Sequence, residues 1–183
     1  WNHSIIKTRA DLKIWLAYER HKYAAELSSG GIFCLAEKDF IWKYQKRLRK
    51  TEYYLNSGKR IKYLISRYLL VRLSIRLGLN IRLNSCGKGL YIVHIASVIT
   101  NGDIGEDYAA FPNTLVGSDT TGAIPLIGDH VIAYTGATIA GKIHIASNVK
   151  ISANSFVNQS IDEENVIVAG VPAKIVSRKR ISP

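Results

Sequence analysis

Cysteine is scarce in this chain of 183 residues, which contains only Cys34 and Cys86. Two cysteines are too few for a disulfide scaffold, and they lack the CxxC spacing of a zinc site, so we expect a reducing cytoplasm. Long uncharged apolar runs are also absent, because the richest segment, residues 61–79, contains four Lys or Arg side chains. No charged segment followed by an apolar one opens the chain. We therefore expect neither a membrane span nor a secretory signal.

Acidic side chains are scarce in the first half of the chain. Residues 1–90 carry 19 basic and 6 acidic side chains, whereas residues 91–183 carry 6 basic and 8 acidic ones. The net charges are therefore +13 and −2. This split indicates a basic front joined to a chemically different second part, within a length that permits one domain or two small ones.

Helical periodicity marks the basic front. Three helices are expected, over residues 10–27, 40–55 and 59–78. A fourth short piece is expected around residues 32–37. In the middle helix the apolar residues share one side, and the basic residues, Arg49 among them, are expected on the opposite, solvated side.

Three partners could explain the positive charge. Nucleic acid is disfavoured, because no recognition motif, zinc pattern or RNA-type aromatic signature accompanies the basic residues. Peripheral membrane contact remains open, because the segment 59–79 resembles a basic interfacial helix. The favoured interpretation is solvated charge on helices whose apolar sides pack internally or against a partner subunit.

A period of six dominates the second half. Apolar or small anchors recur in two series: Cys86, Ile92, Val98, Ile104, Ala110 and Val116, then Ile127, Ala133, Ile139, Ile145, Ile151 and Val157. A second set lies four residues after the later anchors: Val131, Ala137, Ile143, Val149, Ser155 and Ile161. This period predicts a parallel β-helix with three sides per turn, whose stacked coils bury a continuous core. The wider gap between Val116 and Ile127 predicts an inserted loop at 117–126, and glycines are expected at tight corners: Gly102, Gly105, Gly128, Gly136 and Gly141.

Three segments carry a family resemblance: GLYIVH at 89–94, IGDHVIAYTGATIAGKIHI at 127–145 and AGVPAKIV at 169–176. They resemble the serine acetyltransferase branch of the hexapeptide-repeat acyltransferases, and also related O-acetyltransferases of capsular and exopolysaccharide clusters. The resemblance implies an α+β protein, with an N-terminal α-helical domain followed by a left-handed parallel β-helix of hexapeptide repeats. We expect a basic helical domain over 1–79, the acyltransferase domain over 80–176 and a tail over 177–183.

The resemblance further implies a homotrimer that binds acetyl-CoA in the groove between neighbouring β-helices, without a metal. Transfer of an acetyl group to a hydroxyl needs a base, oxyanion donors and a positioned thioester. His94 matches the catalytic histidine of the family and is the expected general base. His130 and His144 are expected at surface positions of the repeats, and His3 and His21 have no companion motif.

Other site residues follow from the same resemblance. Asn80 aligns with the residue that orients the catalytic imidazole, with Asn84 as a competitor. Gly117 matches the backbone N–H that faces the thioester, although a corner glycine is an equal explanation. Small residues that line the pantetheine groove match Thr135 and Ala153, and Lys174 is expected near the CoA phosphates; ordinary packing and solvation would also explain these three.

Two departures bear on the acceptor. Val93 stands where serine acetyltransferases have an Asp, and Ala123-Ile124-Pro125 replaces a stretch with an Arg-His pair before the proline. That arginine would meet the serine carboxylate. We therefore expect acetylation of a sugar hydroxyl in a surface polysaccharide or its precursor, in the cytoplasm or at the inner face of the membrane. The alternatives are a serine O-acetyltransferase of cysteine synthesis and a non-catalytic trimeric scaffold.

Overall fold

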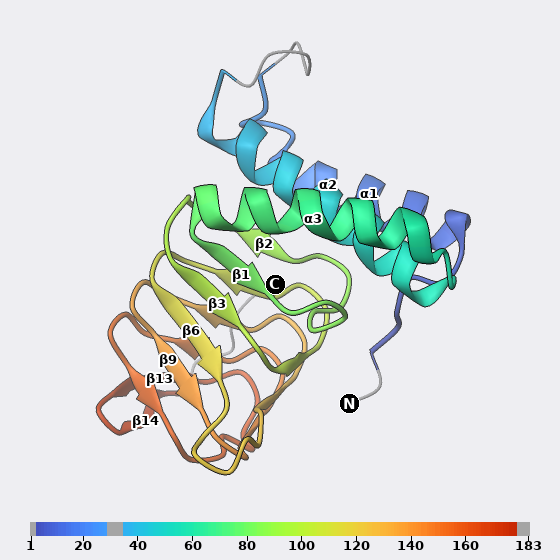
Figure 1. Ribbon diagram of the computed structural model, residues 1–183. Coiled ribbons are helices and arrows are strands. Elements are labelled where there is room, and N and C mark those ends of the chain that lie inside the picture. The colour runs from blue at the N-terminus through green and yellow to red at the C-terminus, as the bar shows by residue number, and fades with distance from the viewer. Residues whose placement is uncertain (1–2, 29–34, 179–183) are drawn as a thin grey trace.

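The computed structural model describes residues 3–28 and 35–178, and three helices precede a stack of short parallel strands (Figure 1). The helices are α1 (Arg9–Tyr23), α2 (Glu37–Asn56) and α3 (Arg60–Leu77). All three predicted helices are thus confirmed. Of the fourth piece expected at 32–37, residues 32–34 lie outside the described residues, and Glu37 begins α2.

The strands of the β-helix form three sheets. The first contains β1 (Leu79–Ile81), β3 (Val98–Thr100), β6 (Thr114–Gly117), β9 (Thr138–Ala140) and β12 (Phe156–Val157). The second contains β4 (Asp103–Ile104), β7 (Leu126–Ile127) and β10 (His144–Ile145). The third contains β2 (Tyr91–Ile92), β5 (Ala109–Ala110), β8 (Ile132–Ala133), β11 (Lys150–Ile151), β13 (Ile167–Gly170) and β14 (Ala173–Ser177). The expected α+β fold with a left-handed parallel β-helix is confirmed.

The strand register confirms the predicted insertion. Tyr91 pairs with Ala109, 18 residues later, which is three sides of six residues. Ala109 pairs with Ile132, 23 residues later, and the same offset of 23 occurs at this level in the other two sheets. The five extra residues belong to the loop at 117–126, which leaves the β-helix without disturbing the coils on either side.

The anchors of the six-residue period form the core of the β-helix. All twelve are at most 2% exposed, and the second set of six is buried as well. The period therefore predicted each inward-facing position correctly. Because every coil contributes equivalent side chains, the core continues along the whole stack.

The corners of the coils rely less on glycine than expected. Of the five predicted corner glycines, Gly136 and Gly141 adopt positive φ, 75° and 100°. Other corners place left-handed polar residues: Asn84, Asp107, Asn113, His130, Asn148, Asn154 and Asn165. Asn and Asp tolerate this conformation better than other residues with a side chain. Gly105 meets a different need, because a Cβ there would lie 2.9 Å from the carbonyl carbon of Gly128 in the next coil.

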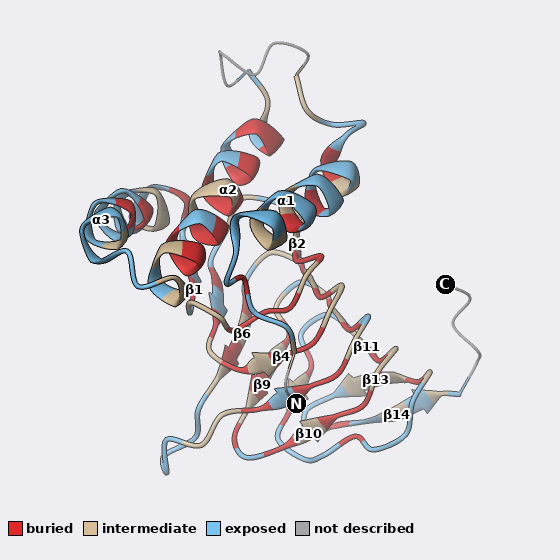
Figure 2. Cartoon of the chain, turned by 90° about the vertical axis from the view of Figure 1, so that its right-hand side faces the viewer, coloured by how far each residue is buried: buried red, intermediate tan, exposed pale blue. Residues whose placement is uncertain are grey.

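The helices cover the N-terminal end of the β-helix (Figures 1 and 2). Tyr44 and Leu48 of α2 share one buried apolar cluster with Ile81, Leu90 and Ile92 of the first coils. β1 begins and β14 ends within one residue of the expected domain boundaries at 79/80 and 176/177. Those boundaries remain a prediction, because one core runs through both parts.

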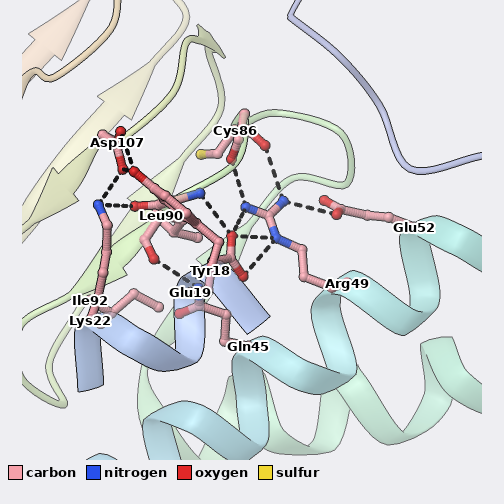
Figure 3. A network of polar contacts seen from close by, with 12 residues as sticks. Tyr18, Glu19, Lys22, Gln45, Arg49, Glu52, Cys86, Leu90, Ile92 and Asp107 are labelled. Carbon is pink, nitrogen blue, oxygen red and sulfur yellow. Dashed lines mark hydrogen bonds and ion pairs between the residues drawn. The ribbon is translucent and has the colours of Figure 1, made fainter. Parts of the chain in front are cut away.

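Arg49 corrects the expectation that the basic side of α2 is solvated. Its side chain is fully buried, with Nη2 2.7 Å from Glu19 Oε1 and Nη1 2.9 Å from Glu52 Oε2 (Figure 3). The same guanidinium donates to the carbonyl oxygens of Cys86 at 3.0 Å and Gly87 at 2.8 Å. Its five N–H donors fit this set of acceptors, which a residue pattern within α2 cannot show.

More polar side chains of the helices pair with the backbone of the first coil. Gln45 donates to the carbonyl of Leu90 at 2.7 Å, and the N–H of Ile92 donates to the Tyr23 hydroxyl at 2.9 Å (Figure 3). The N–H of Gly89 donates to Glu19 at 3.2 Å. A first coil without a partner would expose unpaired backbone groups, and the helices satisfy them one by one.

Candidate active site

His94 follows β2 directly, at the corner where the chain leaves the third sheet. Its side chain is 56% exposed, and its Nδ1 lies 3.0 Å from Glu37 Oε2. An ionised carboxylate can only accept a hydrogen bond, so Nδ1 carries the proton in the neutral imidazole. Nε2 then keeps its lone pair. The arrangement suits a side chain that accepts a proton from a substrate hydroxyl.

Glu37 and Lys38, the first two residues of α2, hold the backbone on both sides of His94. Glu37 Oε1 accepts the N–H of Ile95, and Lys38 Nζ donates to the carbonyl of Val93. Burial acts to raise the pKa of Glu37, but its hydrogen bonds with His94 and Ile95 outweigh that effect and lower the pKa below its usual value. Glu37 is therefore ionised at neutral pH and fixes the ring of His94.

Lys38 brings a buried cation next to this corner. Its side chain is 6% exposed, and its Nζ lies 3.5 Å from Glu26 Oε2 and 4.9 Å from the centre of the Tyr91 ring. The Tyr91 hydroxyl donates to Glu26 at 2.9 Å. Burial, aided by Glu26, raises the pKa of Tyr91 to about 12. The hydroxyl thus stays protonated and continues to donate.

Asn80 does not meet the expectation that it orients His94. It lies on the exposed face of β1, in register with Ile99, and is not among the hydrogen-bond partners of His94 in the described residues. Its competitor Asn84 is occupied too, because its amide pairs reciprocally with that of Asn56 at 2.9 and 3.0 Å. Glu37 takes the orienting position instead. Sequence reasoning missed it because it lies 57 residues before His94, outside the repeats.

Thr135 and Ala153 share a corner with His94. In the third sheet, consecutive coils pair Ile92, Ala110, Ala133 and Ile151. Two residues after these partners come His94, Pro112, Thr135 and Ala153. The N–H of Asn154 donates to the carbonyl of Thr135 at 2.9 Å, which ties the two lower coils together at this corner. Thr135 and Ala153 are exposed, so an open line of small side chains runs down the β-helix from His94.

Gly117 and Lys174 lie apart from this corner. Gly117 ends β6, whereas the His94 corner precedes the strands of that sheet, and its register partner is Ala140. Lys174 is exposed on β14, paired with Ala169. Within the described residues neither has a hydrogen bond to His94. One chain therefore does not bring either residue to the histidine.

A carboxylate neighbour by itself does not distinguish His94. His130 Nδ1 lies 3.5 Å from Asp107, and His144 Nδ1 lies 2.9 Å from Asp162. His94 differs because the backbone on both sides of it is bound by α2. Across residues 3–28 and 35–178, no three His, Cys, Asp or Glu side chains gather as metal ligands would, and no helix is long and apolar enough to cross a membrane.

Sequence comparison identifies relatives for half of the chain. No protein-family model matches it. Serine acetyltransferases of Staphylococcus aureus and Staphylococcus epidermidis are each 37% identical to it, over 97 and 98 residues. These alignments cover 50% and 51% of this chain, and 45% and 46% of the relatives. The chain thus matches about half the length of these curated enzymes.

Structural comparison extends over nearly the whole chain. A serine acetyltransferase in complex with cysteine has a TM-score of 0.73 at 24% identity, over 94% of this chain and 68% of that one. The enzyme of Brucella abortus gives 0.69 at 22% identity, over 91% and 69%. A truncated serine acetyltransferase apoenzyme gives 0.69 at 26%, over 92% and 71%. In both sequence and fold, this chain resembles the serine acetyltransferase-like branch of the hexapeptide-repeat acyltransferases, as its repeats predict.

Proposed function

We propose that this chain is an acetyl-CoA-dependent O-acetyltransferase of the serine acetyltransferase type, with His94 as its general base. The observation that carries the proposal is the contact between Glu37 and Nδ1 of His94, which leaves Nε2 as the proton acceptor at an exposed corner. A solved serine acetyltransferase of similar fold is a complex with CoA, which supports CoA as the acyl carrier.

The reaction is direct transfer without a covalent enzyme intermediate. His94 Nε2 takes the proton of the acceptor hydroxyl as its oxygen attacks the thioester carbonyl, and a tetrahedral oxyanion forms. The C–S bond then breaks, and the protonated imidazole returns its proton to the departing thiolate. Glu37 steadies the imidazolium between the two steps, as an ionised carboxylate on Nδ1.

Serine is the first candidate for the acceptor. The relatives described above are serine acetyltransferases, which favours serine O-acetylation over the sugar acetylation expected from sequence. A sugar hydroxyl remains the second candidate because Val93 and the stretch 123–125 lack the acidic, Arg and His side chains of the serine enzymes. Sugars carry no carboxylate that needs such a cation.

A trimer would complete the site from two chains. Gly117 lies at the end of β6, away from the His94 corner of its own chain, so the oxyanion donor would have to come from a neighbour. Thr135 and Ala153 would line the pantetheine arm below His94, and Lys174 would meet the CoA phosphates. Asn80 has no part in this arrangement. We propose that the reaction takes place in the cytoplasm, in keeping with two cysteines and no disulfide pattern.

The first experiment measures release of free CoA from acetyl-CoA by wild type, His94→Ala and His130→Ala. His130 is a matched control, because it is also an exposed corner histidine beside a carboxylate. Loss of a general base should reduce turnover by about 10²-fold or more in His94→Ala. His130→Ala should keep wild-type turnover. Equal turnover in wild type and His94→Ala would overturn the proposed mechanism.

The second experiment identifies the acceptor. CoA release is measured with L-serine, with free sugars and with oligosaccharides, each against a blank without acceptor. Turnover that depends on L-serine supports the first candidate. Turnover that depends on a saccharide, with none on serine, supports the second and assigns a meaning to Val93.

A further inference from the structure

The outer face of α3 is apolar and exposed. Five large side chains on it are more than half exposed: Ile61 at 76%, Leu64 at 64%, Ile65 at 59%, Tyr68 at 61% and Ile75 at 78%. A helix on the surface of a globular protein normally turns such a face toward the core. Here the core-facing side has Ser66, Leu70 and Leu77 instead, and α3 lies at the edge of the helical layer (Figure 2).

A cation-lined groove runs beside this face, between α2 and α3. Its lining consists of Lys43, Lys46, Arg47 and Lys50 from α2 and Leu69, Arg72, Leu73 and Arg76 from α3. Six of these eight residues are cations and none is acidic. Arg72 also donates to the hydroxyl of Tyr68 at 3.2 Å, so the groove and the apolar face meet along α3.

Helical geometry places the two features side by side. Ile61, Tyr68 and Ile75 recur at intervals of seven residues and form one stripe along the outside of the helix. Arg72 and Arg76 lie on the flank of that stripe, facing the groove. α3 has five basic side chains and no acidic one. A stripe of apolar side chains bordered by cations is the pattern of a helix that lies in a membrane interface.

Charge selects the occupant of this surface. A second copy of the same face would bring like charges together, at an electrostatic cost. A nucleic acid would neutralise the cations but would leave the aliphatic side chains without an apolar partner. Anionic headgroups above an acyl-chain boundary satisfy both parts at once. We propose that α3 and the cation-lined groove dock this protein onto an anionic phospholipid membrane, with α3 parallel to its plane.

The helix is already fixed in the orientation that docking requires. The hydroxyls of Thr51 on α2 and Ser66 on α3 lie 2.8 Å apart, and both residues are buried. Binding therefore needs no ordering of this helix, which lowers its entropic cost. The proposal does not depend on the acetyltransferase function, and its test uses no acetyl-CoA.

The test is sedimentation of the full chain with large vesicles. One set contains phosphatidylglycerol and phosphatidylcholine, and the other contains phosphatidylcholine alone. Binding is expected to the anionic set only, and it should weaken as salt rises from 50 to 500 mM because the headgroup attraction is screened. Two double variants dissect the surface: Ile61→Ser with Ile75→Ser, and Arg47→Glu with Lys50→Glu. Each should weaken binding by about tenfold or more.

A matched control on α1 combines Lys13→Glu with Ile14→Ser. Ile14 is 61% exposed, and this pair removes one exposed aliphatic and reverses one charge away from α3. Circular dichroism melting curves verify that each variant folds, as expected for exposed positions. Absence of binding to anionic vesicles at 50 mM salt would overturn the proposal. It would also fail if the control weakened binding as much as the α3 pair, or if Ile61→Ser with Ile75→Ser dissolved a self-associated species and left vesicle binding unchanged.

Discussion

The β-helix and the helical layer are stabilised in opposite ways. In the β-helix, equivalent apolar anchors repeat in every coil and the backbone pairs with itself. In the helical layer, individual polar side chains such as Arg49 and Gln45 meet individual backbone groups of the first coil. The first kind of order recurs along the sequence and can be recognised there, whereas the second depends on single residues far apart in the chain.

Arg49→Met should have the largest effect on stability. The substitution keeps an unbranched side chain but leaves Glu19 and Glu52 buried without their cation, and removes the donors to Cys86 and Gly87. Breaking a buried ion pair on one side costs roughly 3–5 kcal/mol. Urea unfolding followed by circular dichroism measures the change.

Lys50→Met is the control for this prediction, because Lys50 is the next residue in α2 and is exposed. It should change the unfolding free energy by less than about 0.5 kcal/mol. Similar losses from both variants would mean that the helical layer, like the β-helix, depends on average composition and not on particular contacts.

Ile139→Ala and Ile151→Ala test whether anchors are interchangeable. Both side chains are fully buried, one coil apart in different sheets. Each truncation should cost about 3 kcal/mol, within the usual range for Ile to Ala in a core. The two losses, measured by urea unfolding, should agree within about 1 kcal/mol. A large difference would show that the coils are not equivalent units.

The extent to which sequence predicted the fold follows the same division. The anchors, the loop at 117–126 and the three helices were all predictable, because each repeats a periodic pattern within a short window. Arg49 was assigned to the wrong side of its helix. Periodicity ranks residues by hydrophobicity and cannot detect that two carboxylates and two carbonyls from other segments require a buried cation.

Glu37→Gln should have the smallest of these effects, and it links the two regions functionally. The amide keeps the size of the side chain but removes the charge that steadies protonated His94. Turnover in the CoA-release assay should fall by about tenfold, which corresponds to roughly 1.4 kcal/mol of transition-state stabilisation. Unchanged turnover would show that His94 needs no carboxylate from the helical layer.

The acidity of Glu37 gives this variant a pH signature. Its pKa is lowered in the folded protein, so its contribution to stability is present above the usual value of 4.5 and is lost as the pH falls through the folded-state pKa. The difference in melting temperature between wild type and Glu37→Gln should therefore shrink from pH 5 to pH 3.5. A difference that widened over this range would contradict the assigned direction.

Site prediction from sequence succeeded where residues share the repeat. His94, Thr135 and Ala153 lie at one corner because a fixed coil length brings equivalent positions into line. Glu37 was missed, and the orienting role was given to Asn80. A contact between a helix start and a coil corner obeys no period, so it needed three-dimensional coordinates.

The constant offset of 18 residues between coils has a consequence for how this chain can change length. Adding or deleting one whole coil between the helical cover and the final antiparallel pair β13–β14 would restore every ladder hydrogen bond. Deleting any other number of residues would turn later anchors toward the wrong sheet. The loop at 117–126 avoids this problem because it projects from a corner. Viable insertions and deletions here therefore come in whole coils or in corner loops.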